Sequence, residues 1–361
     1  MQVPFNALGR AVAEQRDALM RATTDVLDSG WYVRGTQHAA FVSELQAYLG
    51  VPHVIGCGNG TDALELALRA ARTDGRRTIV TAANAGGYAS TAARAAGLRV
   101  RYVDVDPETH TVDPAAVSAA IDDDTFALVV THLYGRVADL DGVRAAIAGR
   151  DVLVVEDCAQ SFGASTPAGR AGALADLATF SFYPTKTLGA LGDGGAVATS
   201  DPDLAQRVAR LGEYGWTTKY EAGLPGGRNS RLDELQAAYL RVRLPLVDEG
   251  NATRRSIIAR YAAAASSRIH VLPADDSSHA AHLAVVVTDS AESLAAHLTQ
   301  AGIGTAVHYP VPDHRQVAFA DGEQADLPVT ESFVGRILSL PLFTELTDTE
   351  IEAVCDALAT Y

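Results

Sequence analysis

The sequence predicts an α/β protein in which a large domain with a mostly parallel sheet precedes a smaller α+β domain. The length of 361 residues suits about two domains. Up to about residue 200, short β-branched runs alternate with amphipathic stretches, which is the pattern of repeated βα units. After residue 233 the pattern becomes mainly helical, and a short mixed unit follows it. These observations together predict the fold class.

The elements of the large domain follow from the spacing of apolar residues. Residues 17–49 are predicted to be helical, with an interruption at 30–35 (GWYVRG). The expected strands are residues 53–56, 78–82, 99–104, 126–131 and 152–156, and the expected helices are 61–71, 88–96, 114–121 and 140–147. This alternation predicts a parallel sheet with helices on both faces. Residues 178–182 and 196–200 flank a glycine-rich segment and could pair antiparallel.

The C-terminal part is predicted to be a separate, smaller unit. Pro245 is expected to kink or split the helix that begins at Asp233. The expected elements beyond it are a strand at 282–288, a helix at 291–301, a strand at 305–308 and a last helix at 348–358. Thr347 is a plausible cap for that helix, with Glu350 three positions on. We place the large domain at residues 1–245 and the small domain at 246–361.

Composition limits the classes of partner. The chain has 44 acidic residues against 29 Lys and Arg, a net charge of −15. Nucleic-acid binding normally requires clustered Lys and Arg, so we expect no nucleic-acid partner, although a small anion could still bind in a locally positive site. Cys57, Cys158 and Cys355 lie far apart, which indicates neither a disulfide framework nor a zinc site. With no evident signal peptide or membrane span, we expect a cytosolic protein without a membrane partner.

Residues 58–61 (GNGT) lie between an expected strand and an expected helix. Free amides and the helix dipole at such a start can bind a phosphate, and glycine lets the backbone approach it. The alternative is that Gly60 and Thr61 form only a turn and a helix cap, which is the more common situation for this feature alone. No P-loop pattern occurs.

Two adjacent acids, Glu156 and Asp157, follow an apolar strand. Ligands gather at the carboxyl ends of strands in open α/β sheets, and a buried acid there needs a cation or a hydrogen-bond donor. A helix cap or a solvated loop is the alternative. A metal site is disfavoured because no His–carboxylate cluster lies nearby in the sequence.

Lys186 stands between an apolar run and a glycine-rich turn, and Lys219 is the only other lysine of the chain. An enclosed amine has a lowered pKa and can attack carbonyl groups. The usual alternative, a surface lysine, fits this glycine-rich position less well. A phosphate cradle, a lysine for a Schiff base and an acid for a pyridinium nitrogen together indicate pyridoxal phosphate, with Tyr88 as an aromatic ring for the cofactor or as mere packing.

These segments resemble the DegT/StrS family of fold-type-I aminotransferases, which use pyridoxal phosphate and act on nucleotide-linked keto sugars. The matching segments cover most of the chain and include GNGTDALELAL at 58, VEDCAQSFGA at 155, FSFYPTKTLGALGDGGA at 180, NSRLDELQAAYLRVRL at 229 and HYPVPDHRQ at 308. The resemblance implies the fold of that family, with a mostly parallel, seven-stranded type of sheet in the large domain. It also implies a homodimer with shared active sites.

The resemblance also implies roles for individual residues. Lys186 would form the Schiff base and carry the proton between cofactor and substrate. Asp157 would pair with the pyridine nitrogen and Gln160 with the phenolic oxygen, while Tyr88 would stack on the ring. Gly60, Thr61 and Ser181 would hold the phosphate, and Asn229 would reach the phosphate in the neighbouring subunit.

The substrate side rests on weaker signals. His308 and Tyr309 are candidates for lining the sugar site, with a role in the core as the alternative. Lys219, Arg228 and Arg231 are candidates for contacting the nucleotide diphosphate, with solvated surface charges as the alternative.

The resemblance implies transfer of an amino group from L-glutamate to C3 or C4 of a keto-6-deoxy sugar carried on dTDP. Relatives that dehydrate sugars carry His in place of Lys186, so the sequence favours transamination over dehydration. A catalytically weak regulator or binding protein of the same fold is the other alternative. The glycine-rich loop at 83–88 (ANAGGY) departs from the family pattern around Tyr88.

Overall fold

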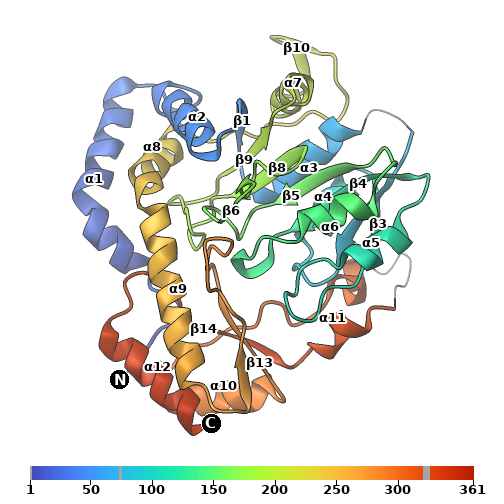
Figure 1. Ribbon diagram of the computed structural model, residues 1–361. Helices are drawn as coiled ribbons and strands as arrows, with labels where there is room; N and C mark the ends of the chain where they lie inside the picture. The colour runs from blue at the N-terminus through green and yellow to red at the C-terminus, as the bar shows by residue number, and fades with distance from the viewer. Residues whose placement is uncertain (1, 73–74, 320–325) are drawn as a thin grey trace.

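A seven-stranded sheet forms the centre of the computed structural model, which describes residues 2–72, 75–319 and 326–361 (Figure 1). In spatial order the strands are β1 (His53–Cys57), β9 (Gly195–Thr199), β8 (Leu177–Ser181), β5 (Leu153–Asp157), β4 (Thr125–Thr131), β2 (Thr78–Ala82) and β3 (Arg99–Val103). The pairings from β8 to β3 are parallel, and β9 is antiparallel to both its neighbours. The predicted fold class and the predicted antiparallel pair are confirmed.

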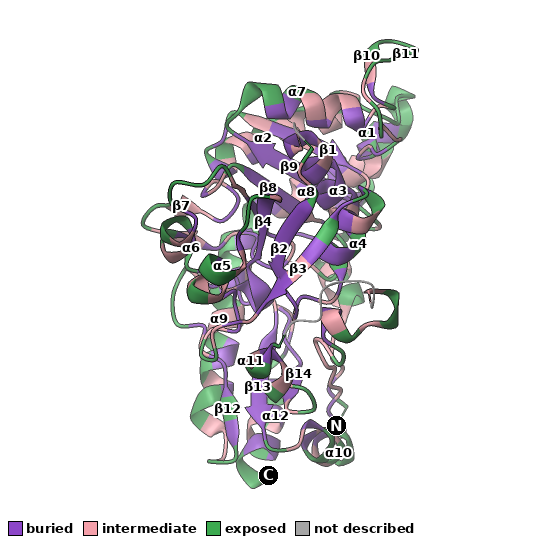
Figure 2. Ribbon diagram, turned by 90° about the vertical axis from the view of Figure 1, so that its right-hand side faces the viewer, coloured by how far each residue is buried: buried purple, intermediate pink, exposed green. Residues whose placement is uncertain are grey.

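Helices cover both faces of this sheet, as the apolar strands require. One face packs against α3 (Gly60–Ala71), α4 (Tyr88–Ala95) and α7 (Pro202–Leu211). The other face packs against α2 (Thr36–Leu49), α8 (Glu234–Arg243), α5 (Pro114–Ala120) and α6 (Leu140–Ala146). Figure 2 shows the central strands as mainly buried. Every residue of β2 and β4 is buried, which explains why their sequences contain only apolar residues and threonine and do not alternate with charged residues.

The first helix, α1 (Leu8–Ser29), begins earlier than expected. Its N-cap, Ala7, makes no side-chain capping bond, so the sequence carries no start signal there. Gly30 ends the helix in the left-handed conformation with φ 61°, which glycine adopts without strain. The predicted interruption at 30–35 therefore separates α1 from α2.

A buried carboxylate joins the start of α2 to α8. Glu234 is 1% exposed and accepts hydrogen bonds from the backbone amides of Gly35, Gln37 and His38 at 2.7, 2.9 and 2.7 Å. Free amides at a helix start need acceptors, and an acid there also suits the helix dipole. Glu234 thus fixes α2 against α8 although the two elements are distant in sequence.

The long α9 (Val247–Ala264) runs from the central sheet to the smaller unit (Figure 1). It follows α8 after a single 3₁₀ turn, η2 (Leu244–Leu246), that contains Pro245. Proline cannot donate the backbone bond of a continuous helix, so the expected split is confirmed.

The smaller unit is a three-stranded antiparallel sheet, β12 (Ile269–Val271), β13 (Ala284–Thr288) and β14 (Ile337–Leu340). One face packs against α9, α10 (Ala291–Gln300) and α12 (Asp348–Thr360). Thr347 and Glu350 form the full capping box predicted for the last helix. The opposite face packs on Leu133 and Tyr134 of the large unit, so the small sheet is covered on both sides.

The strand expected at 305–308 is wrong. This segment makes only an isolated bridge between Ala306 and Ser339 at the edge of β14. The actual neighbours of β13 are β12, which is only three residues long, and β14, which lies far along the chain. Such short pieces carry too few residues for a period-two pattern.

The remaining elements are short. They are η1 (Leu133–Gly135), β6 (Ser165–Thr166), β7 (Gly169–Arg170), β10 (Trp216–Thr218), β11 (Glu221–Ala222), η3 (Asp313–Arg315), η4 (Val317–Phe319) and α11 (Pro328–Ser332). At the N-terminus, Val3 pairs with Ile303 of the smaller unit. The first residues thus contact the C-terminal unit, and the domain limits of 1–245 and 246–361 stay a prediction.

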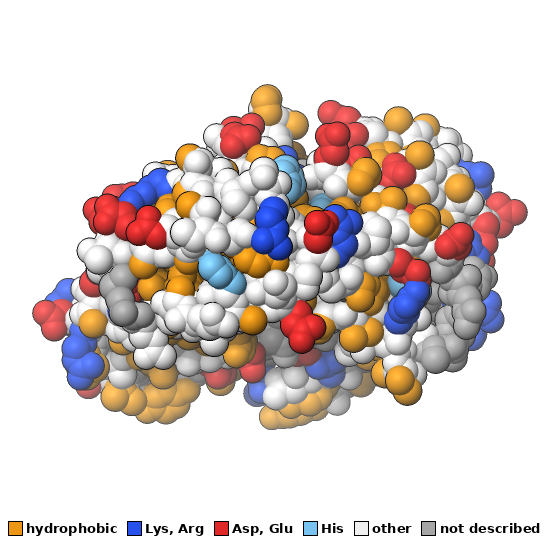
Figure 3. Space-filling model, turned by 90° about the horizontal axis from the view of Figure 1, so that it is seen from below, with side chains coloured by type: hydrophobic (Ala, Val, Ile, Leu, Met, Phe, Trp, Pro, Cys, Tyr) orange, Lys and Arg blue, Asp and Glu red, His pale blue; other side chains and the backbone are white. Residues whose placement is uncertain are grey.

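The surface agrees with the composition. On the face seen in Figure 3, acidic and basic side chains are interspersed and form no continuous basic band. Among the described residues, no helix has the length and apolar character needed to cross a bilayer.

We expect Glu234→Ala to destabilise the protein by about 3 kcal/mol, because three buried amides lose their acceptor. For a chain of this length that loss corresponds to a melting temperature lower by about 4 °C in thermal denaturation. Glu234→Gln, which keeps one acceptor oxygen, should lose less. An unchanged melting temperature for the alanine variant would contradict the role of Glu234 as the anchor of α2.

Candidate active site

A cavity of about 540 Å³ lies at the edge of the central sheet where its parallel strands end. Open α/β sheets bind ligands at this edge because the strand ends and the helix starts meet there. The lining residues used below are Gly60, Thr61, Tyr88, Thr131, Asp157, Gln160, Ser181, Lys186, His282, His308 and Tyr309. The structure thus brings together nine of the residues singled out in the sequence, from segments far apart in the chain.

The start of α3 forms one wall of the cavity. Asn59 caps the helix by accepting the amide of Asp62 at 2.8 Å, which leaves the earlier amides of the first turn for a ligand. A Cβ atom on Gly60 would lie 2.6 Å from Cβ of Ser181, so only glycine allows these two segments to meet. Gly60, Thr61 and Ser181 therefore form a cradle with donor groups at the positive end of a helix.

The two adjacent acids of β5 point to opposite faces of the sheet. Glu156 lies in the core, where it accepts the amides of Gly172 and Leu174 at 2.9 and 2.8 Å. Asp157 faces the cavity and accepts the amide of Ala159 at 3.1 Å and the hydroxyl of Thr131 at 3.2 Å. Alternation along the strand thus separates one structural acid from one acid available to a ligand.

Glu156 also pairs with a buried histidine. Nε2 of His132 lies 2.9 Å from Glu156, while Nδ1 of His132 accepts the amide of Ala138 at 3.1 Å, so Nε2 carries the proton. His132, Glu156 and Cys158 are close enough to one another to hold a metal ion. The His132 and Glu156 atoms are already satisfied by protein hydrogen bonds, so this group is a structural network.

Lys186 and Asp157 both line the cavity and carry opposite charges when ionised. Burial lowers the pKa of Lys186 to about 8, and the charge of Asp157 opposes this shift. Burial raises the pKa of Asp157, against the effect of the Ala159 amide and of Lys186. A neutral amine is a nucleophile, and a buried carboxylate without a full cationic partner suits a protonated ring nitrogen.

Gln160 is held between two tyrosines at the side of the cavity. Its Oε1 accepts the amide of Tyr134 at 2.6 Å, and its Nε2 donates to the hydroxyl of Tyr309 at 3.0 Å. Tyr309 packs flat against Gly86, where a Cβ atom would lie 2.7 Å from the ring. The loop at 83–88 is richer in glycine than the family pattern because Gly86 leaves space for the ring of Tyr309.

Tyr88 begins α4 on the open side of the cavity and is 48% exposed. Its ring meets that of Tyr309 edge-on, with centroids 6.2 Å apart. The carboxylate of Asp313, which the sequence reasoning missed, accepts the hydroxyl of Ser90 at 3.0 Å in the first turn of the same helix. Burial raises the pKa of Asp313 to about 7. Asp313 lies next to His314 in the matching HYPVPDHRQ segment, but only the fold brings it to α4.

The predicted substrate residues fall in three places. His308 and Tyr309 line the cavity. Arg228 lies beside α3, where its guanidinium is paired with both Asp62 and Glu65. Lys219 is exposed at the turn between β10 and β11, and Arg231 does not line the cavity. Their roles toward a substrate stay predictions.

Asn229 does not line the cavity of its own chain and is exposed. Its neighbour Ser230 donates to Asp62 at 2.6 Å and accepts the amide of Gly58 at 3.0 Å. These two bonds hold the residue next to Asn229 against the start of α3.

His282 and Thr131 also line the cavity and were missed as site residues. Thr131 is the last residue of β4 and lies opposite Asp157 of β5. Its place at the end of an expected strand was the sequence feature that could have identified it as a site residue. His282 comes from the segment before β13, so only the docking of the small sheet onto the large unit brings it to Lys186. Burial, together with the charges of Lys186 and Arg254, holds the pKa of His282 well below its usual value.

Known proteins resemble this chain over nearly its whole length. The sequence profile of the DegT/DnrJ/EryC1/StrS aminotransferase family matches residues 13–359. A Saccharopolyspora erythraea protein called erythromycin biosynthesis sensory transduction protein EryC1 is 41% identical, over 96% of each chain. A dTDP-3-amino-3,4,6-trideoxy-α-D-glucose transaminase of Streptomyces venezuelae is 39% identical, over 99% of this chain and 95% of that protein. The crystal structure of S. venezuelae DesV with a ketimine intermediate has a TM-score of 0.95 and 38% identity, covering 99% of this chain and 98% of that one.

The fold and the site define a sugar aminotransferase that uses pyridoxal phosphate. The chain belongs to the DegT/DnrJ/EryC1/StrS aminotransferase family. Its cavity fits that cofactor, because an enclosed amine, a buried acid and a helix-start phosphate cradle face the same space.

The lowered pKa of Lys186 predicts the pH range in which its amine reacts with an aldehyde. At pH 8 about half of the Lys186 amines are neutral, whereas an amine with an ordinary pKa of about 10.4 would be neutral in about one molecule of 250. We expect pyridoxal phosphate, added to cofactor-free protein and reduced with borohydride, to label Lys186 with a midpoint near pH 8.

Peptide mapping by mass spectrometry measures this labelling. Lys219 is the internal control, because it is exposed at a turn and lies outside the cavity. Equal labelling of both lysines at pH 8 would contradict the assignment of Lys186 as the reactive amine.

Proposed function

We propose that this protein transfers an amino group from L-glutamate to the keto group of a 6-deoxy sugar linked to dTDP. The observation that carries the proposal is the placement of the Lys186 amine and the Asp157 carboxylate in one cavity with the start of α3. A nucleophile, an acid for a pyridine nitrogen and a phosphate cradle are the parts that this reaction needs. The S. venezuelae transaminase named above supports C3 as the position of the new amine.

The cofactor would be held by residues of the large unit. Gly60, Thr61 and Ser181 would bind its phosphate, and Asp157 would pair with its ring nitrogen. Gln160 would approach the phenolic oxygen through the amide hydrogen that does not bond Tyr309. Tyr88 would cover one face of the ring. When bound, pyridoxal phosphate supplies an electrophilic carbon and an electron sink for the substrate.

Lys186 would act twice in each half of the reaction. Its neutral amine would hold the cofactor. In the half-reaction with glutamate the free amine would carry a proton from the substrate carbon to the cofactor carbon, and in the half-reaction with the sugar it would carry one in the opposite direction. A pKa near 8 suits both tasks, because the amine can accept and release a proton near neutral pH. Asp157 keeps a negative charge beside the ring nitrogen, so that the nitrogen stays protonated.

The sugar side of the site would be built from His308 and Tyr309, which line the cavity from the small unit. Burial lowers the pKa of His308, with a further effect from Lys186, so its imidazole is neutral and can accept or donate a hydrogen bond to a sugar hydroxyl. Lys219 and Arg231 are the candidates for the diphosphate. Arg228 is proposed to act indirectly, because its pairing with Asp62 and Glu65 orients the neighbouring Asn229.

The active protein is proposed to be a homodimer. A group of exposed aromatic side chains, Trp31, Tyr32, Tyr214 and Tyr220, lies on the large unit, where Arg34 and Glu213 join the two segments by an ion pair at 2.5 Å. Exposed aromatic patches of this kind mark protein interfaces. Asn229, exposed near this patch, would then reach the phosphate bound by a second copy.

We place the reaction in the cytoplasm. Cys57, Cys158 and Cys355 are all free thiols in the structure, which suits a reducing compartment.

The catalytic proposal is tested with purified protein loaded with pyridoxal phosphate. We expect an absorbance band near the visible edge that disappears on adding L-glutamate. The protein that has reacted with glutamate should then convert a dTDP-3-keto-6-deoxy sugar to an amino sugar. NMR of that sugar should locate the new amine at C3. Lys186→Ala should abolish turnover. A dTDP-4-keto sugar is the comparison substrate.

Each possible outcome of this test has a definite meaning. Turnover by Lys186→Ala would contradict the assigned role of the lysine. A wild-type protein that binds the cofactor but aminates neither sugar would favour the alternative of a regulatory protein with the same fold. The name of the S. erythraea relative, a sensory transduction protein, is the observation that supports this alternative.

The dimer proposal predicts that Trp31→Ala weakens self-association about tenfold or more, because a large aromatic at an interface centre contributes much of the binding energy. Sedimentation velocity over a range of protein concentrations measures this. Val317→Ala, at a residue 93% exposed on η4, is the control. A wild-type protein that sediments as a monomer at every concentration would overturn the dimer.

A further inference from the structure

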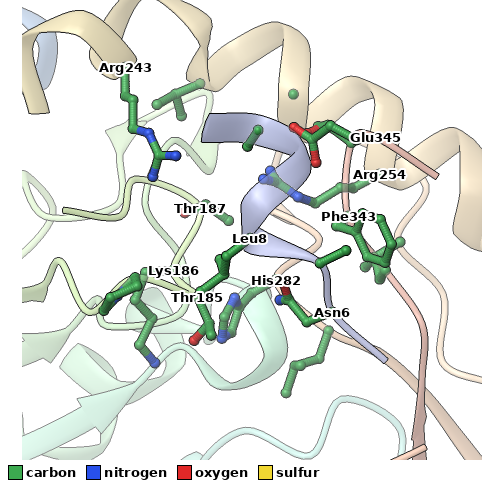
Figure 4. Close-up of a pocket in the computed structure, with 18 of the residues that line it drawn as sticks. Asn6, Leu8, Thr185, Lys186, Thr187, Arg243, Arg254, His282, Phe343 and Glu345 are labelled. Atoms are coloured by element: carbon green, nitrogen blue, oxygen red, sulfur yellow. The ribbon is translucent and has the colours of Figure 1, made fainter. Parts of the chain in front are cut away.

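A pocket of about 390 Å³ lies at the end of α3 that is remote from the phosphate cradle. Its walls come from the ends of α3 and α7, from the segment between α4 and β3, and from residues 224–226. The pocket shares no lining residue with the cavity around Lys186. It also shares none with the adjoining space on the N-terminal side of that lysine, which Figure 4 shows. It is therefore separate from the active site.

Three arginines line this pocket, and no acidic side chain of the described residues does so. They are Arg69 and Arg72 at the end of α3 and Arg207 of α7. The chain as a whole has a net charge of −15. Three guanidinium groups with no carboxylate among them thus make a locally positive site on an acidic protein.

Backbone carbonyls hold two of these guanidinium groups in place. Nη2 of Arg69 donates to the carbonyl of Ala95 at 2.6 Å, and Nη2 of Arg207 donates to the carbonyl of Arg72 at 3.1 Å. Both groups are therefore positioned before a ligand arrives, which lowers the cost of binding one.

One donor of the pocket lacks an acceptor. Nε of Arg207 is buried and has no hydrogen-bond partner among the described residues. A buried donor without an acceptor is costly, so its presence calls for an explanation. The helix dipole favours cations at the end of α3, which accounts for Arg69 and Arg72 but supplies no acceptor for Arg207. A bound anion would supply one.

The positive charge of the pocket is only partly balanced by its surroundings. Nε of Arg69 donates to Glu65 at 2.7 Å, and Glu65 is also paired with Arg228. One carboxylate is thus shared by two guanidinium groups. Arg72 and Arg207 form no ion pair with any residue in the described part of the chain.

Gly226 leaves room for a ligand beside Arg69. A Cβ atom on Gly226 would lie 2.6 Å from Nη1 of Arg69, and the φ of Gly226 is 81°, a conformation that favours glycine. Any other residue here would cover this end of the guanidinium group. The loop therefore keeps a third arginine accessible from the pocket.

The remaining walls are apolar. Leu68, Leu98 and Leu211 are buried, Leu224 is partly buried, and Pro225 lies beside it. The volume lies in the range of roughly 300–1,000 Å³ that is typical of sites for small molecules. The pocket thus combines fixed positive charge with an apolar surface large enough for an organic group.

We propose that this pocket binds a phosphate monoester with an apolar body, whose phosphate group contacts Arg69, Arg72 and Arg207. A phosphate monoester carries a charge of about −1.5 to −2 at neutral pH and has three acceptor oxygens, so it can bond several guanidinium groups at once. A carboxylate has two oxygens and one charge, which three arginines exceed. The apolar body would lie against the leucines. The inference does not rest on the proposed function, because the two sites share no residue.

The test uses phenyl phosphate as the probe. It is titrated calorimetrically into protein loaded with pyridoxal phosphate, so that the cavity around Lys186 already holds its cofactor. We expect Arg207→Gln to weaken binding by roughly tenfold to a hundredfold, the effect of losing a charged hydrogen bond. Binding that is equal in wild type and Arg207→Gln would overturn the proposal.

A second variant covers the case in which Arg207→Gln does not fold. The side chain of Arg72 makes no hydrogen bond within the described residues, so Arg72→Gln removes no such contact from the protein. It should also weaken the binding of phenyl phosphate, and unchanged binding would overturn the proposal. Retention of the cofactor absorbance shows that each variant is folded.

The control variant is Arg16→Gln. Arg16 is exposed on α1 and does not line the pocket, and its loss changes the net charge by the same amount. It should bind phenyl phosphate as the wild type does. A loss equal to that of Arg207→Gln would mean that only the overall charge matters, and would overturn the proposal.

Inorganic phosphate tests the apolar part of the pocket. Phenyl phosphate should bind about tenfold tighter or more, because its ring leaves water for the apolar walls. Inorganic phosphate bound as tightly as phenyl phosphate would indicate an adventitious ion only, and would overturn the proposal.

Discussion

The site depends on keeping a lysine amine and a carboxylate together in a partly desolvated space at the end of a parallel sheet. Burial alone would drive both groups toward their neutral forms, and each opposes that tendency in the other. The sheet provides this balance because β5 ends in Asp157 and β8 leads into the turn that carries Lys186. Antiparallel β9 then closes the turn, with Gly195 opposite Ser181.

The smaller unit completes what the sheet begins. Its three-stranded sheet packs on Leu133 and Tyr134, next to the amide that holds Gln160. This docking brings His282, His308 and Tyr309 to the lysine from the other side. The large unit thus supplies the groups that we propose for the cofactor, and the small unit supplies His308 and Tyr309, which we propose for the sugar.

The sequence alone was sufficient to predict those strands and site residues that are marked by a local sequence pattern. Gly60, Asp157 and Lys186 each stand at the junction of a strand and a turn, and such junctions meet at one edge of an α/β sheet. The expected bounds of β2 agree with the structure, because a buried strand with sharp ends has a clear pattern.

Residues that act through tertiary contacts could not be found in the same way. Arg228 looks like any charged residue until α3 brings Asp62 and Glu65 to it. Asp313 meets Ser90 of α4 only after the small unit has packed against the large one, and β12 is too short to show a period. Pairing across long sequence separations leaves no periodic signal in either partner.

The alternation of Glu156 and Asp157 along β5 has a consequence for how this protein can change over evolution. A single residue inserted or deleted within β5 would exchange the faces of the two acids, placing Glu156 toward the cofactor and Asp157 against His132. Both networks would be lost in one step.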